Sequence, residues 1–249
     1  MDEVTIELPG SRIADDDIYL KEDRRDQPKD CFKDSLKFID VKRWPTNSIW
    51  LDIGCATGDY IDFLKTRCNQ FKFIGLDISE QMIKEASKRD PESRYISGDV
   101  RNLSLLPQNS IDIITIFGVI DCFDEVKTTF TSLMHWIKPG GLILALDIVN
   151  AYPVDTVTRY RRTHELNTPW EMGWNTYSRH TLERQIMQFQ QVESFDFIPF
   201  EIATDLLPKT EDPMRTWTIK TEEKPRQLVN GAGQMVNLYF IPIKIKHCK

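Results

Sequence analysis

The chain has 249 residues, a formal net charge of −6 and a pI near 5.4. This acidic balance predicts no general attraction to nucleic acid or to an anionic membrane, and no apolar run is long enough to span a bilayer. Five scattered cysteines and the lack of a signal-peptide pattern favour the cytoplasm, and without a C-x-x-C motif or a His pair at ligand spacing we expect no metal.

The N-terminal part is polar and charged up to about residue 30, and we interpret its run Asp15–Asp17 as solvated surface. A helix is predicted over Cys31–Trp44, and Pro45 should end it. We expect a single domain of residues 1–249, in which 1–45 form a lid and helix, 46–148 a core, and 149–249 capping insertions with closing strands.

Two strands with unusual ends follow. The apolar run Ser48–Ile53 reads as a buried parallel strand, and the loop after it is Gly54-x-Ala56-x-Gly58. Small residues there let backbone N–H groups approach a ligand, and the following helix N-terminus favours negative charge. The second strand, Phe71–Leu76, closes with Asp77, an acid placed to hold a ribose diol. Together they predict a nucleoside-containing cofactor.

The glycine spacing selects the cofactor. The G-x-G-x-x-G pattern of dinucleotide sites is absent. With Asp52 in front of the loop, the stretch instead resembles motif I of the class I S-adenosylmethionine-dependent methyltransferases, D-x-G-x-G-x-G. The departure is Ala56 at the middle glycine, where one methyl group is tolerable if the local φ is negative. We interpret Cys55 as a small packing residue beside the cofactor.

Further motifs of the family follow in register. The predicted elements are a helix Ser79–Lys88 with Ser79 as N-cap, a strand Ser93–Val100, a strand Ile111–Gly118, a helix Asp124–Ile137, the stop Lys138–Gly141, and a strand Leu142–Ile148. The resemblance implies an α/β, Rossmann-like seven-stranded sheet of order 3-2-1-4-5-7-6. Its last strand, Met235–Ile243, should be antiparallel, helices should cover both faces, and insertions should cap the substrate.

The resemblance also implies the cofactor, S-adenosylmethionine, with S-adenosylhomocysteine as product. Asp99 should accept from the adenine amine while Val100 contacts the ring, and Tyr19 of the lid should reach the methionine end. The other residues expected at the cofactor are Asp52, Gly54, Cys55, Ala56, Gly58, Asp77, Ile78, Met82, Phe117 and Gly118.

The sequence becomes individual after residue 148. We predict a helix Arg179–Gln190, a strand Val192–Ile202, and short strands at Thr216–Thr221 and Arg226–Val229. Substrate pockets in this fold form over the carboxyl ends of the strands, so Val149–Tyr177 and Ala203–Gly233 should shape the acceptor site.

The first of these two insertions is rich in aromatic and basic residues. Tyr160, Arg161, Trp170 and Trp174 are the acceptor-binding candidates. Arg159, Arg161 and Arg162 could receive a phosphate or carboxylate of the acceptor, or they could simply pair with surface carboxylates.

The expected chemistry is direct displacement, for which the protein aligns the reactants and excludes water. A general base is needed only for a hydroxyl or a protonated amine, and the candidates are His164, His180 and Asp121. We favour O- or N-methylation of a small molecule. A protein or RNA methyltransferase and a non-catalytic cofactor-binding protein remain alternatives. Phe117–Ile120 stands where amino-group methyltransferases of bases or glutamine carry an Asn/Asp-Pro-Pro-Tyr/Phe tetrapeptide.

Overall fold

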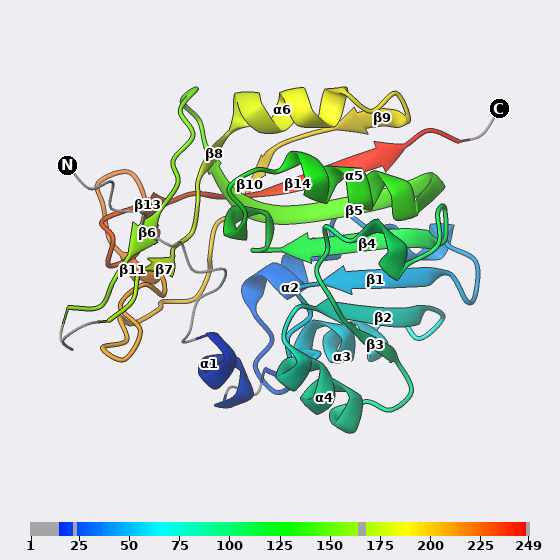
Figure 1. The fold of residues 1–249 in the computed structure, drawn as a ribbon, viewed down its shortest axis with the longest axis horizontal. Helices are drawn as coiled ribbons and strands as arrows, with labels where there is room; N and C mark the ends of the chain where they lie inside the picture. Colours follow the sequence, from blue (N-terminus) through cyan, green and yellow to red (C-terminus); the bar gives the residue numbers. More distant parts are fainter. Residues whose placement is uncertain (1–14, 22–23, 164–167, 248–249) are drawn as a thin grey trace, which may run out of the picture.

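The computed structural model describes residues 15–21, 24–163 and 168–247. A mixed sheet crosses the molecule, in the order β10-β14-β5-β4-β1-β2-β3 (Figure 1), with β9 also pairing with β14 and β8 with β5. Its strands are β1 (Ile49–Ile53), β2 (Lys72–Asp77), β3 (Arg94–Ser97), β4 (Ile111–Phe117), β5 (Ile137–Asn150), β8 (Tyr177–Ser178), β9 (Val192–Phe195), β10 (Ile198–Pro199) and β14 (Leu238–Ile245).

The sheet confirms the predicted topology. Strands β1 to β5 are parallel, and β14 runs antiparallel to β5 and to both β9 and β10. The order 3-2-1-4-5-7-6 is therefore present, with β14 as strand 7 and the β9–β10 segment as strand 6. Ile53 pairs with Leu76 on one side and Ile116 on the other, so the carboxyl ends of β1, β2 and β4 meet at one edge.

Helices pack on both faces because the buried strands are apolar on both sides. In β1, Trp50 belongs to the apolar cluster under α2 (Asp30–Ser35) and α3 (Asp59–Lys65). Its neighbour Leu51 belongs to the cluster under α5 (Lys127–Trp136) and α6 (Arg179–Met187). The α3 side chains that the sequence directs inward are at most 4% exposed: Tyr60, Ile61, Phe63 and Leu64.

The insertions form small sheets beyond the carboxyl ends of the parallel strands, at the left of Figure 1. One is the pair β6 (Arg159–Tyr160) and β7 (Glu171–Met172). The other is a three-stranded meander of β11 (Trp217–Ile219), β12 (Gln227–Val229) and β13 (Met235–Val236), of which the first two strands were predicted. Helix α1 (Asp15–Lys21) contacts α4 (Glu80–Arg89).

The predicted helix Cys31–Trp44 is wrong in length. Helix α2 ends at Ser35, and a separate 3-10 turn, η1, covers Val41–Arg43. Between them the chain turns so that Phe38 packs on Phe240, with ring centroids 4.8 Å apart. The Asp40 side chain then accepts a hydrogen bond from the backbone of Lys42 at 3.2 Å, which starts the new turn.

Two predicted strands are each divided. Val192–Ile202 breaks into β9 and β10 because Phe197 turns into the core at 6% exposure, and Asp196 caps its backbone nitrogen at 2.7 Å. Met235–Ile243 breaks at Asn237, since β13 belongs to the meander and β14 to the main sheet. In the second case one stretch of chain serves two sheets, which an apolar pattern does not reveal.

The helix predicted at Asp124–Ile137 starts three residues late. The Glu125 carboxylate accepts from the backbone of Lys127 at 2.9 Å and of Thr128 at 3.3 Å, so it caps α5. The fifth strand begins at Ile137 and includes the predicted stop Lys138–Gly141. Two further 3-10 turns are η2 (Leu103–Leu105) and η3 (Ile120–Cys122).

The predicted N-cap Ser79 is correct: its hydroxyl oxygen accepts from the backbone nitrogen of Met82 at 3.3 Å. Ser178 caps α6 in the same way and accepts from the backbone nitrogen of Thr181 at 3.1 Å.

Candidate functional site

The loop between β1 and α3 is built from left-handed residues. Gly54, Ala56 and Gly58 have φ values of +73°, +45° and +88°. The condition under which the extra methyl group would be tolerated, a negative φ at Ala56, is therefore not met: the alanine adopts the conformation that a glycine would adopt without strain. Alternating left-handed residues curl the backbone so that its N–H groups form a concave cradle, which suits an anionic or polar ligand group.

Asp77 closes this loop from the end of β2. Its Oδ2 accepts a hydrogen bond from the backbone nitrogen of Ala56 at 2.9 Å, and its Oδ1 accepts from Ser79 at 3.0 Å. The carboxylate thus lies at the same edge of the sheet as Gly54, as the sequence predicted. A carboxylate oxygen has two lone pairs, so these contacts leave capacity for a diol.

The segment after β4 packs against the same loop. A Cβ on Gly54 would collide with Cγ2 of Val119, so a larger residue at position 54 would push the two segments apart. Gly118 has a φ of +64°, and its missing side chain would face open space. Phe117, next to it, is half-buried and packs on Tyr60 with ring centroids 5.1 Å apart.

Asp52 lies beneath the loop and is 4% exposed. Its Oδ1 accepts from the Thr115 hydroxyl at 2.9 Å, and Trp50 Nε1 lies 3.2 Å from that same hydroxyl. Burial raises the pKa of Asp52 to about 7, while the Thr115 hydrogen bond lowers it and the Asp77 charge adds to the rise. Lys29 is the cation that acts on this carboxylate. A cationic ligand group at this point would restore the ionised form.

Lys29 interacts with both helix α1 and Asp52. Its Nζ lies 5.2 Å from the centroid of the Tyr19 ring in α1, and the Arg215 guanidinium lies 5.8 Å from the same ring. Tyr19 is half-buried. The sequence analysis did not identify Lys29 or Arg215. Neither belongs to a local sequence pattern, and only the tertiary structure brings them close to Tyr19.

Asp99, the predicted adenine contact, already forms hydrogen bonds with another residue of the chain. Both oxygens of Asp99 bind Arg101, with Nη2 to Oδ2 at 2.5 Å and Nε to Oδ1 at 3.0 Å. These hydrogen bonds hold the pKa of Asp99 below its usual range. The guanidinium lies 4.7 Å from the centroid of the Phe123 ring, and Asp99 and Arg101 line an open hollow of about 510 Å³.

The remaining cofactor candidates differ in exposure. Ile78 is 63% exposed beside Asp77, so an apolar side chain faces solvent next to the predicted ribose contact. Val100 and Met82 are buried, and so is Cys55. A Cβ on Gly75 would lie 2.7 Å from the Cys55 sulfur, which agrees with a packing role for this cysteine.

The candidate bases have different surroundings. His164 lies outside the described residues. His180 is exposed on the first turn of α6. Asp121 is 3% exposed in η3, and Asp147 of β5 is 2% exposed beside it. Burial, and after it the charge of Asp121, raises the pKa of Asp147 well above its usual range. Asp147 Oδ2 accepts from the backbone of Ile120 at 2.9 Å.

The arginines of the first insertion are largely paired. Arg159 binds Asp124, and Arg162 Nε lies 3.4 Å from a carboxylate oxygen of Glu171, a buried side chain. Arg161 is exposed, with its guanidinium 5.4 Å from the Trp170 ring centroid. The sequence left two roles open for these arginines, binding an anionic group of the acceptor or pairing with carboxylates. Arg159 and Arg162 pair with carboxylates.

The aromatic candidates of this insertion also have partners. The Tyr160 hydroxyl donates to Glu171 at 3.1 Å. Trp174 packs against a small apolar cluster of Ile148, Leu228 and Val236. Trp170 is 38% exposed.

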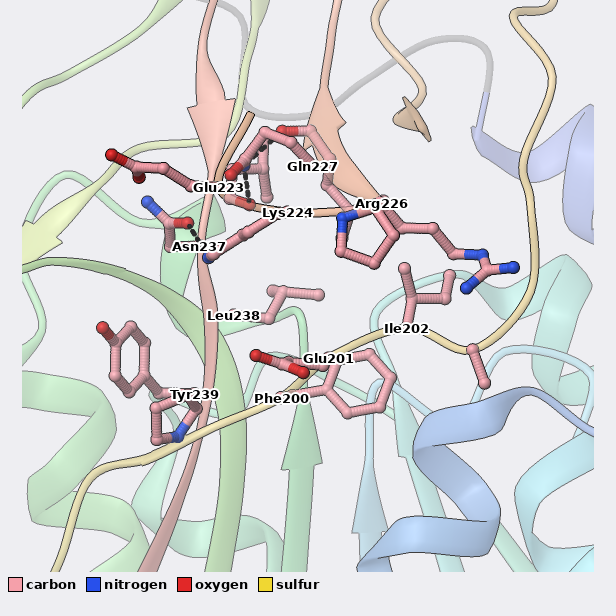
Figure 2. A pocket seen from close by; sticks show the side chains of 15 residues that line it. Phe200, Glu201, Ile202, Glu223, Lys224, Arg226, Gln227, Asn237, Leu238 and Tyr239 are labelled. Carbon is pink, nitrogen blue, oxygen red and sulfur yellow. Dashed lines mark hydrogen bonds between the residues drawn. The ribbon is translucent and has the colours of Figure 1, made fainter. Parts of the chain in front are cut away.

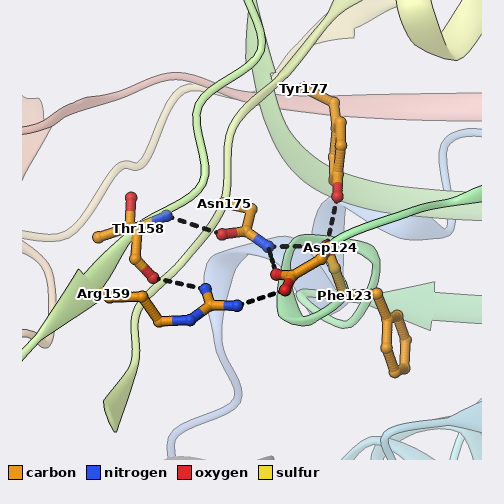
Figure 3. Close-up of polar contacts among 6 residues, drawn as sticks. All are labelled: Phe123, Asp124, Thr158, Arg159, Asn175 and Tyr177. Carbon is orange, nitrogen blue, oxygen red and sulfur yellow. Dashed lines mark hydrogen bonds and ion pairs between the residues drawn. The ribbon is translucent and has the colours of Figure 1, made fainter. Parts of the chain in front are cut away.

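Asn175, which the sequence analysis missed, joins this insertion to the segment after β4 (Figure 3). It is fully buried, its Nδ2 donates to the Phe123 carbonyl at 2.7 Å and to Asp124 at 3.2 Å, and its Oδ1 accepts from the Thr158 backbone at 2.9 Å. The Tyr177 hydroxyl donates to the same Phe123 carbonyl. The insertion and the post-β4 segment are therefore held as one unit.

Comparisons with known proteins agree with this geometry. A family model described as "Methyltransferase domain" matches residues 51–145. The chain is 31% identical over 94 residues to a malonyl-acyl-carrier-protein O-methyltransferase of Hamiltonella defensa, covering 38% of this chain and 35% of that protein. It is 30% identical over 126 residues to a trans-aconitate 2-methyltransferase of Afipia carboxidovorans, covering 50% and 46%. The matches thus span less than half the length of these curated relatives.

Among solved structures, a Haemonchus contortus phosphoethanolamine N-methyltransferase 2 superposes with a TM-score of 0.55 at 14% identity, over 87% of this chain and 53% of that one. This likeness shows the fold. Within the described residues, no helix has the length and apolar character needed to cross a membrane.

Proposed function

Because this chain belongs to the class I S-adenosylmethionine-dependent methyltransferases, we propose that it transfers the methyl group of S-adenosylmethionine to a hydroxyl or amine of a small molecule. The observation that carries the proposal is the left-handed loop of residues 54–58, closed by Asp77 at the carboxyl edge of the sheet. A strand-to-helix turn without a ligand has no need of a strained Ala56 held by an acid from the next strand.

The residues at this edge fit the cofactor of the family. In the proposed arrangement Asp77 accepts from the ribose hydroxyls, and the exposed Ile78 covers one face of the adenine. Asp99 and Arg101 border the hollow on the adenine side. Asp52 and Lys29 face the methionine end, where an ammonium and a carboxylate need opposite charges. The open space beside Gly118 admits the ligand between the β1 and β4 loops.

The bound cofactor supplies a methyl group already activated for displacement, so the protein has to align the acceptor and exclude water. Asp121 is our candidate for taking the proton of a hydroxyl acceptor, because it is buried in the segment that follows Gly118. His180, exposed on α6, is the weaker candidate. Asp121→Asn should lower kcat and leave cofactor affinity within about twofold, whereas His180→Ala should change neither.

Small-molecule acceptors are favoured over macromolecules by two observations. One of the relatives named above is a trans-aconitate 2-methyltransferase, and the chain is also 27% identical over 104 residues to an N,N-dimethyltransferase of Streptomyces venezuelae that is named for an amino sugar nucleotide. The insertions also lie beyond the carboxyl ends of the parallel strands (Figure 1), and the net charge of −6 gives no general attraction to a polyanion. The free cysteines at positions 31, 55, 68 and 122 suit the reducing cytoplasm in which we place the protein.

The test is to incubate the protein with methyl-labelled S-adenosylmethionine and fractionated cell extract. Label in the low-molecular-weight fraction supports the proposal. Label in protein or RNA would favour the macromolecular alternative. No transfer by a protein that binds S-adenosylhomocysteine tightly would leave a non-catalytic cofactor-binding role.

A further inference from the structure

A cavity of about 410 Å³ lies where the meander meets the main sheet (Figure 2). Its walls come from the end of β10 and the residues after it, from the turn before β12, and from the start of β14. Pockets for small molecules have volumes of about 300–1,000 Å³, so this space accommodates a ligand of one or two rings.

The cavity belongs to the same edge of the sheet as the cofactor residues. Leu238, in its wall, pairs with Ile148 at the carboxyl end of β5. Phe200, also in the wall, packs on Phe240 at 5.6 Å between ring centroids, and Phe240 packs on Phe117 at 6.0 Å. Phe117 directly precedes Gly118. A row of packed rings therefore connects the cavity wall at Phe200 to the end of β4.

A second set of contacts ties the cavity to the cofactor loop. Asp30, the first residue of α2, accepts hydrogen bonds from the backbone nitrogens of Ala203 and Thr204 at 3.0 and 2.9 Å. Phe32 of the same helix packs on Tyr60 of α3 at 4.8 Å. Ala203 lines the cavity, so one helix turn connects its rim to the helix behind residues 54–58.

The lining combines an apolar wall with two exposed carboxylates, Glu201 and Glu223, and two cations, Lys224 and Arg226. Apolar side chains come from Phe200, Ile202, Leu228, Val236 and Leu238. Above Leu238 in Figure 2, the half-buried Lys224 donates from Nζ to Oδ1 of Asn237 at 3.2 Å. An ammonium has three donors, so this bond leaves capacity for an oxygen of a ligand. Arg226 turns away from Lys224 and pairs with Asp205 at 2.7 Å.

The first insertion offers less room for an acceptor. Its residues Arg159 and Arg162 are paired with carboxylates, and Trp174 is packed against Leu228 and Val236. Those two residues also line the cavity. Trp174 thus supports the cavity wall from behind instead of lining a pocket of its own.

We propose that this cavity receives the apolar ring portion of the methyl acceptor, and that Lys224 binds an oxygen, as a hydroxyl, carbonyl or carboxylate, at the far end of that molecule. The reactive hydroxyl or amine then lies toward Phe117 and Gly118. The assignment of the ligand as the acceptor rests on the proposed methyl transfer, whereas the assignment of the cavity as a binding site does not.

The first experiment titrates the full chain with 8-anilinonaphthalene-1-sulfonate, a ring-bearing anion whose fluorescence rises on burial. Ala203→Trp should weaken dye binding about tenfold, since the indole fills the rim while the backbone bond to Asp30 remains. Ala232→Trp is the matched control, because Ala232 is an exposed loop alanine outside the lining. Dye affinity equal in wild type and Ala203→Trp, or no dye binding by the wild type, overturns the proposal.

A second pair of variants tests the cation. Lys224→Met keeps the apolar stem of the side chain and removes its charge. Dye binding should weaken about tenfold, as expected for the loss of a hydrogen bond to a charged group. Lys220→Met, four residues earlier and exposed, should have no effect. If both lysine variants bind the dye equally, Lys224 does not hold the anion and the polar half of the proposal fails.

The third measurement separates this proposal from the proposed function. In the labelled methyl-transfer assay, Ala203→Trp should lower transfer at least tenfold while S-adenosylhomocysteine affinity, measured by calorimetry, stays within twofold of wild type. Unchanged transfer in this variant would place the acceptor elsewhere and leave the methyltransferase function standing. The wild type could instead bind the dye but transfer no methyl group, while Ala203→Trp loses dye binding. That result would retain the cavity as a binding site and reject the proposed methyltransferase function.

Discussion

The backbone nitrogen of Ala56 and the carboxylate of Asp77, 21 residues apart in sequence, meet at 2.9 Å across the ends of β1 and β2. This contact holds a loop whose three left-handed residues would otherwise have many conformations, because the acid fixes the middle one. Asp77 therefore shapes the loop before any ligand arrives, and the ribose contact that we propose for it uses an acid already in place.

Replacing Asp77 tests that double role. Asp77→Ala should weaken S-adenosylhomocysteine binding by roughly 10- to 150-fold, because hydrogen bonds to a charged group contribute about 1.5–3 kcal/mol. The S-adenosylhomocysteine affinity of Asp77→Asn should lie between those of wild type and Asp77→Ala, because one side-chain oxygen still accepts a hydrogen bond from the backbone. Titration calorimetry measures all three proteins. Equal affinity in wild type and Asp77→Ala, or tighter binding of NAD than of the methyl donor, would exclude this assignment.

Replacing Ala56 with glycine should destabilise the protein less than the same replacement at other alanine positions. A left-handed alanine carries a strain of about 1–2 kcal/mol, whereas glycine costs about 0.4–1 kcal/mol in extra unfolded-state entropy. We therefore expect Ala56→Gly to leave the free energy of unfolding unchanged or raised by up to about 1.5 kcal/mol. Ala232→Gly, at an exposed loop position without a positive φ, should lower it. Denaturant titration compares them, and an equal loss in both variants would argue against strain at Ala56.

Asn175 should be sensitive even to an isosteric change. In Asn175→Leu the Thr158 nitrogen loses its buried partner, which costs about 1–3 kcal/mol, whereas the Phe123 carbonyl keeps the Tyr177 hydroxyl as a donor. In Asn175→Asp a carboxylate faces Asp124, so the loss should be larger at neutral pH and smaller in acid. Thermal unfolding across pH is the measurement. A stability of Asn175→Asp that does not change with pH would contradict this arrangement.

The buried Asp52 predicts a pH dependence of the ligand-free protein. Its pKa rises from 3.8 to about 7 on folding, so the folded state binds the extra proton between these values. The unfolding free energy should therefore fall as pH rises from about 4 to about 7. Asp52→Asn keeps the acceptor for Thr115 and should be more stable than wild type at pH 8, by on the order of 1–4 kcal/mol, with no difference near pH 4. Identical pH profiles of the two proteins would refute it.

The local patterns of the sequence determined the parallel core. The near-continuous burial of β1, the caps Ser79 and Ser178, and the acid at the end of β2 are each encoded within a few residues, so they could be predicted without knowing the fold. The order of the strands followed from the resemblance to the methyltransferase family, whose topology has one arrangement of them.

Only the tertiary structure decided how the insertions meet that core. The charge of Lys29 acts on Asp52, and Asn175 binds the segment after β4. Each of these depends on a pairing across the fold that no periodicity records. The same holds for the ends of α2 and β9, where Phe38 and Phe197 left their predicted elements to pack elsewhere. Neighbouring residues are enough to determine the conformation of a segment when its caps and apolar pattern agree. The tertiary structure decides where a helix or strand ends when packing a side chain elsewhere in the fold releases more free energy than continuing that helix or strand.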